Sequence, residues 1–98
     1  MTDLVISEAA RADLREIVDY MARDNPERAE TFLDELLARI TAVAEHPQAY
    51  PVRTDWPVPV RAAVHRGYLI VFREHEQRIE ITRVLHSARD IPAILRDR

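Results

Sequence analysis

The sequence predicts an α+β fold in which two antiparallel helices pack on a small, mostly antiparallel sheet. Residues 7–46 show apolar side chains at helical spacing, interrupted once, and the chain after residue 60 breaks into short apolar runs. A further apolar run at residues 4–6 supplies a first strand. The expected order is β-α-α-β-β-β. Residues 1–98 are expected to form one domain. Residues 90–96 are expected to form either a last helical turn or a docking segment.

The two helices are bounded by residues that suit helix ends. Ser7 fits an N-cap, and apolar residues then recur through Leu14–Met21. Asn25 fits a second N-cap, and Pro26 suits the first helical position, where its missing N–H has no partner to lose. The second stripe, Ala29–Ala44, is continuous. Because the connection is short, the helices should form an antiparallel hairpin.

The rest of the chain predicts strands. The proline-rich segment 46–60 should be a loop or an extended edge. Strands are expected at residues 60–65, 68–73 and 78–85, with a tight turn at Gly67, the only glycine, and another at residues 74–77.

One face of this sheet has no cover that the sequence makes obvious. The helical hairpin covers one face, so Leu69, Val71 and Val84 are expected on the other. An apolar strip left open usually marks a partner site.

Composition excludes several kinds of chemistry. The chain has 98 residues, no cysteine and no lysine, so disulfides, thiolate chemistry and lysine-based catalysis are excluded. One glycine is too few for a phosphate-cradling loop. Residues 1–57 hold six arginines against twelve carboxylates, whereas residues 58–98 hold eight against five. The strand-rich part is therefore basic and suits an acidic partner.

We expect no cofactor, metal site or membrane segment, and a cytoplasmic location. The four histidines lack ligand spacing, and no apolar run is long enough to span a bilayer. The acidic pairs Asp13/Glu16 and Asp34/Glu35 are assigned to solvated helix faces.

The candidate functional residues lie on the strands. The basic group consists of Arg61, Arg73, Arg83, His86 and Arg89, with Tyr68 nearby. Arginine suits phosphate or carboxylate ligands, and histidine can carry protons. Binding, catalysis and ordinary strand polarity, with Arg83 paired locally to Asp90, all remain open on this evidence. Arg83 follows the alternation of Ile79 and Ile81, which predicts a partly buried arginine that needs a carboxylate.

Beside this reading, the chain resembles the RelE/ParE toxin superfamily, and its ParE branch in particular. The resemblance rests on "ISEAARADLREIVDYMARDNPERAETFLDELLARI", then "HP", Arg61, "GYLIVF" and the closing "RVLHSARD". It implies a bacterial toxin of a type II toxin–antitoxin pair that inhibits DNA gyrase. It also implies a hetero-oligomer with a ParD-like antitoxin whose C-terminal segment wraps the toxin, and contact with operator DNA only through that antitoxin.

Two alternatives accompany this resemblance. RelE-branch toxins cut mRNA on the ribosome with lysines, arginines and a late tyrosine or histidine. Here Arg61, Arg83 and His86 would be a reduced catalytic set. The other alternative is a degenerate toxin that only binds its antitoxin. The residues expected to contact antitoxin or target are Arg61, Tyr68, Leu69, Val71, Arg73, Arg83, Val84, His86 and Arg89.

Overall fold

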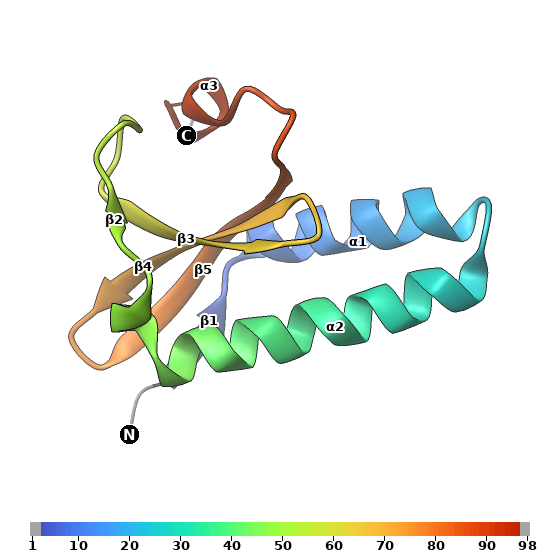
Figure 1. The fold of residues 1–98 in the computed structure, drawn as a ribbon, viewed down its shortest axis with the longest axis horizontal. Helices are drawn as coiled ribbons and strands as arrows, with labels where there is room; N and C mark the ends of the chain where they lie inside the picture. Colours follow the sequence, from blue (N-terminus) through green and yellow to red (C-terminus); the bar gives the residue numbers. More distant parts are fainter. Residues whose placement is uncertain (1–2, 97–98) are drawn as a thin grey trace.

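The computed structural model, which describes residues 3–96, has a five-stranded sheet of order β1-β5-β4-β3-β2. Strand β1 is parallel to β5, and the other pairs are antiparallel. The helices α1 and α2 lie along one face and α3 lies on the opposite side (Figure 1). The elements are β1 (Asp3–Ile6), α1 (Glu8–Ala22), α2 (Pro26–Glu45), a 3-10 turn (Pro47–Ala49), β2 (Val52–Arg53), β3 (Val60–His65), β4 (Tyr68–His75), β5 (Arg78–His86) and α3 (Ile91–Arg96). The predicted α+β fold is confirmed.

Both predicted helix starts are confirmed. The Ser7 side chain accepts a hydrogen bond from the backbone N–H of Ala10. The Asn25 side chain accepts one from Arg28, and Pro26 occupies the first turn of α2. Each cap satisfies a backbone donor that the helix itself leaves unpaired. Among the described residues, no helix is long and apolar enough to cross a membrane.

The hairpin between β3 and β4 turns at two residues with positive φ. Arg66 has φ 47° and Gly67 has φ 84°, the backbone signs of a type I′ turn. Strand β4 is longer than expected and continues to His75, so the next turn contains only Glu76 and Gln77. The predicted turn at residues 74–77 is therefore too long.

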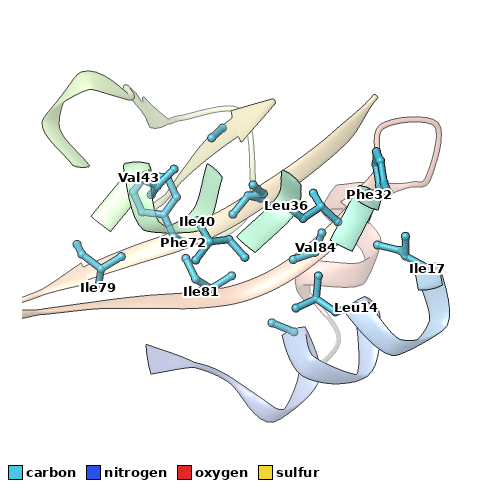
Figure 2. Packing of buried hydrophobic residues seen from close by; sticks show 13 residues of the cluster. Leu14, Ile17, Phe32, Leu36, Ile40, Val43, Phe72, Ile79, Ile81 and Val84 are labelled. Carbon is cyan, nitrogen blue, oxygen red and sulfur yellow. The ribbon is translucent and has the colours of Figure 1, made fainter. Parts of the chain in front are cut away.

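The larger core fills the space between the two helices and the sheet. Strands β4 and β5 contribute side chains that are almost fully buried, and both helices contribute their apolar stripes (Figure 2). The residues labelled there are Leu14, Ile17, Phe32, Leu36, Ile40, Val43, Phe72, Ile79, Ile81 and Val84. Each such side chain contributes about 1.5–3 kcal/mol when removed from water.

The far face of the sheet is covered, contrary to the prediction. Leu69 and Val71 are 8% and 0% exposed. They belong to a second cluster with Ile91, and Trp56 packs against its rim. A proline-rich loop and α3 supply this cover. The sequence did not reveal it because both segments are short and lack a long apolar stripe.

A β-bulge in β5 changes which side chains face the helices. Val71 pairs with Arg83, but Phe72 pairs with Ile81, so Thr82 is an extra residue between them. Beyond the bulge the alternation reverses: Val84 joins the helix-side core and is 2% exposed. Arg83 lies opposite Val71, on the face away from the helices. The expected faces of Val84 and Arg83 were therefore both wrong.

Candidate functional site

The N-terminal half of α1 closes the outer edge of β5. Strand β1 ends at Ile6, so β5 beyond Ile81 has no neighbouring strand on that side. The Ser7 N–H donates to the Ile81 carbonyl, and the Ser7 hydroxyl donates to the Thr82 carbonyl. A carboxylate oxygen of Asp13 then accepts the N–H of Val84 at 2.9 Å. The N-cap Ser7 and the Asp13 side chain of α1 here replace the missing strand as hydrogen-bond partners.

Asp13 also holds Arg83 through a bidentate ion pair. The Arg83 Nε and Nη2 atoms donate to the two Asp13 oxygens at 2.8 and 2.9 Å. The pairing with Asp13 raises the pKa of Arg83. The prediction that Arg83 is partly buried and needs a carboxylate is confirmed. Local pairing with Asp90 is wrong, because Asp90 accepts the N–H of Ala93 at the start of α3.

The assignment of Asp13 to a solvated helix face is also wrong, since it is 6% exposed. A sequence signal was available. Ala10, Asp13, Leu14 and Ile17 are the buried residues of α1, and their spacing is that of one continuous stripe. A carboxylate within an apolar stripe indicates a buried partner.

Arg61 has partners within the protein, whereas Arg73 has no ion-pair partner among residues 3–96. Arg61 donates to the Tyr50 carbonyl, and one of its nitrogens lies 3.6 Å from Glu74. Arg73 is exposed and, among residues 3–96, forms no ion pair. Glu80 lies opposite Arg73 across the strands, but its carboxylate contacts His75 at 3.1 Å. Arg73 is therefore available to an outside anion.

One group of predicted residues does come together at the α1 side of the sheet. Tyr68, His86 and Arg89 line an open hollow of about 520 Å³, together with the exposed Tyr20 of α1. The His86 ring stands edge-on to Tyr68 at 5.1 Å between centroids. Its Nδ1 accepts the N–H of Ala88. This hollow presents two phenols, an imidazole, a guanidinium and the carboxylate of Glu16.

A second hollow, of ≈ 430 Å³, lies on the far side of the sheet beside α3. We call it the α3 hollow. Its apolar lining comes from the proline-rich loop, β3 and α3, and its two cations come from β4 and β5. These residues are Val58, Val60, Ile94, Leu95, Arg73 and Arg83.

The reduced catalytic set is not brought together. Arg61 pairs across the sheet with Phe72, whereas His86 pairs with Tyr68. The two β4 positions, Tyr68 and Phe72, are four residues apart, which corresponds to about 13 Å along β4. Arg83 is committed to Asp13. Leu69, Val71 and Val84 are buried, so they cannot contact a partner while α3 and the helices stay in place.

Comparison with known proteins identifies the family. Residues 4–91 match the family described as "ParE toxin of type II toxin-antitoxin system, parDE". The chain belongs to the ParE toxin family. A solved structure described as the chromosomal ParDE TA system from P. aeruginosa is similar in fold, with a TM-score of 0.76 at 23% identity, covering 88% of this chain and 96% of that one. No curated protein matches the sequence. As a type II ParE-type toxin, the protein has an antitoxin as its partner.

This ParE toxin has one further ionic cluster that the sequence did not predict. Glu35 was assigned to a solvated face, yet its carboxylate contacts Arg28, His65 and Arg66 at 2.9, 3.1 and 3.0 Å. Hydrogen bonds from Arg28 first, and from His65 next, lower the pKa of Glu35 to about 2. The cluster ties α2 to the β3–β4 hairpin, so it is a structural feature of the fold.

Proposed function

We propose that this toxin inhibits DNA gyrase and that a ParD-like antitoxin neutralises it. The observation that carries the proposal is the family match, which extends over residues 4–91 and so includes both helices, the sheet and the start of α3. The exposed surface includes aromatic and cationic side chains, among them Tyr20 and Arg73, of the kinds that are enriched at protein interfaces, which supports action by binding.

The arrangement of the basic residues weighs against the alternative of an mRNA-cutting enzyme. A general acid or base must lie within hydrogen-bond reach of the atoms on which it acts. Arg61 and His86 belong to different strands, at positions four residues apart in register along β4, and Arg61 and Arg83 are bound to groups of the toxin itself. Of Arg61, Arg83 and His86, only His86 is a side chain that carries protons near neutral pH, and it is exposed.

The hollow of Tyr68, His86 and Arg89 is our choice for the contact with gyrase. Arginine and tyrosine are the residue types that most often dominate binding energy at protein interfaces. Tyr20, which lines the same hollow, is 69% exposed.

The test is a supercoiling assay with purified gyrase and relaxed plasmid. We expect the toxin to reduce supercoiling, and Arg89→Ala to weaken this effect, while Arg15→Ala, a change of the same type on the outer side of α1, leaves it intact. A parallel incubation with ribosomes and mRNA tests the alternative. Cleavage that is lost in His86→Ala, with gyrase unaffected, would favour the endoribonuclease instead.

A further inference from the structure

The hollow of Tyr68, His86 and Arg89 contains an acid and a base that do not pair with each other. Glu16 of α1 and Arg89 both line it, and both are exposed. Neither forms an ion pair among residues 3–96. Opposite charges that share a hollow without contact leave a carboxylate and a guanidinium to a ligand that carries both N–H donors and negative charge.

The same hollow has the aromatic surface and the size for a flat ring. The Tyr68 ring is held in place, with its centroid 5.5 Å from that of Phe32 and 5.1 Å from that of the edge-on His86 ring. Tyr20 is 69% exposed, so its ring is open to stacking. A volume of about 520 Å³ lies within the range of small-molecule sites. Exposed aromatic rings of this kind bind nucleobases by stacking.

Two donors at the end of β5 suit a phosphate. The His86 Nδ1 atom accepts the N–H of Ala88, so the neutral ring carries its proton on Nε2, which is then a donor. Arg89 supplies a fork of charged N–H groups, the geometry that matches phosphate oxygens. Arg23 adds positive charge, since its guanidinium carbon lies 6.0 Å from the centroid of the Tyr20 ring. The hollow therefore combines a stacking surface with phosphate donors.

Glu16 distinguishes one nucleobase from the others. An ionised carboxylate only accepts hydrogen bonds. Guanine presents two adjacent N–H donors, at N1 and N2, on its Watson–Crick edge. Adenine and cytosine place an acceptor nitrogen beside their amino group, and uracil and thymine place a carbonyl on each side of their N–H, so each of these brings an acceptor against the carboxylate. Guanine alone gives both carboxylate oxygens a donor.

We propose that this hollow binds a guanine nucleotide. The base stacks on the tyrosine rings and donates to Glu16, and the phosphate accepts from Arg89 and from Nε2 of His86. The inference rests on the proposed function for the role of the hollow as a contact surface, but nucleotide binding itself needs no gyrase. Two sources carry this chemistry: a free guanine nucleotide, and a guanine exposed in a single strand of the DNA on which gyrase acts.

The experiment is an NMR titration of the whole toxin with guanosine 5′-monophosphate (GMP). The comparison ligands are AMP and CMP, which change the base, and guanosine, which lacks the phosphate. We expect GMP to shift the ring signals of Tyr20 and Tyr68, and each comparison ligand to bind at least about tenfold more weakly. The loss of one hydrogen bond to a charged group corresponds to a change of that size.

Three variants separate the contributions. Arg89→Ala should weaken GMP about tenfold and leave guanosine unchanged. Glu16→Gln should reduce the preference for GMP over AMP about tenfold, and Tyr20→Ala should weaken GMP and AMP alike. A merely structural role of Arg89 or Glu16 would change all ligands together. Arg15→Ala and Glu30→Gln are the matched controls and should change no affinity, and backbone spectra that match the parent protein verify that each variant is folded.

A second titration identifies the source of the nucleotide. It compares a short single strand of thymidine nucleotides that contains one central guanine with the same strand without guanine. Tighter binding of the guanine-containing strand than of GMP assigns the site to single-stranded DNA, and weaker binding assigns it to the free nucleotide. Either result supports the proposal.

Three results would overturn the proposal. These are no saturable binding of GMP, equal affinity for GMP, AMP and CMP, or shifts confined to the α3 hollow. Gyrase inhibition by a toxin that binds no GMP would assign the hollow to protein contact alone. Because the titration contains no gyrase, nucleotide binding and the proposed function can fail independently of each other.

Discussion

Asp13 is the residue whose removal should reveal most about how this fold is held together. It is the only charged residue among the buried positions of the described chain, residues 3–96. Its carboxylate satisfies two donors of Arg83 and the N–H of Val84. Replacing it by alanine removes all three hydrogen bonds at once and leaves their donors behind.

The cost can be worked out from those contacts. The buried N–H of Val84 loses its acceptor, which costs about 1–3 kcal/mol. Breaking a fully buried ion pair costs about 3–5 kcal/mol, but the Arg83 side chain is 26% exposed and can turn towards water. We therefore expect Asp13→Ala to lower the free energy of unfolding by about 3 kcal/mol in total, and the melting temperature by about 15 °C.

The assay is urea unfolding at neutral pH, repeated as a double-mutant cycle. Arg83→Met removes the cation and keeps an apolar stem, so Asp13→Ala should cost about 1–2 kcal/mol less in that background. Asp19→Ala, on the exposed part of the same helix, is the matched control and should stay within about 0.5 kcal/mol of the parent protein. A cost below about 0.5 kcal/mol for Asp13→Ala would refute this explanation.

Three further variants test other parts of the fold. The pKa of Glu35 is lowered to about 2 in the folded protein. Its contribution to the free energy of unfolding is therefore present above its ordinary pKa of 4.5 and is lost as the pH falls towards 2. The urea midpoint of Glu35→Gln should approach that of the parent protein over that interval, and a difference that stays constant with pH would contradict this. Gly67→Ala should cost about 1–2 kcal/mol in urea unfolding from the positive φ alone, since the added Cβ would meet only His86 Nε2 at an ordinary 3.8 Å; an unchanged midpoint would exclude the strain. Ile91→Ala should cost about 2 kcal/mol and increase hydrogen exchange in α3 and at Leu69; unchanged exchange would mean that α3 does not protect the far face.

Local signals predicted most of the fold. Both helix starts can be predicted from Ser7 and from Asn25–Pro26, because these residues act on the backbone within one helical turn. The turn at Gly67 is equally local, since its two residues adopt positive φ. Such features need no knowledge of distant parts of the chain.

The residues whose positions were predicted wrongly are placed by a β-bulge and by contacts between parts of the chain that are distant in sequence. The extra residue at Thr82 reverses the alternation of β5, and strict alternation cannot anticipate a bulge. Arg83 and Asp13 are 70 residues apart. The cover over Leu69 and Val71 comes from two short segments on either side of the sheet sequence. Only the folded chain brings these groups together.

The most direct test of the proposed function is gyrase supercoiling measured with increasing amounts of the purified toxin. The proposal predicts a dose-dependent loss of supercoiled product that Arg89→Ala weakens and Arg15→Ala does not, and that prior addition of the cognate antitoxin prevents. Full supercoiling at a large molar excess of folded toxin would contradict it.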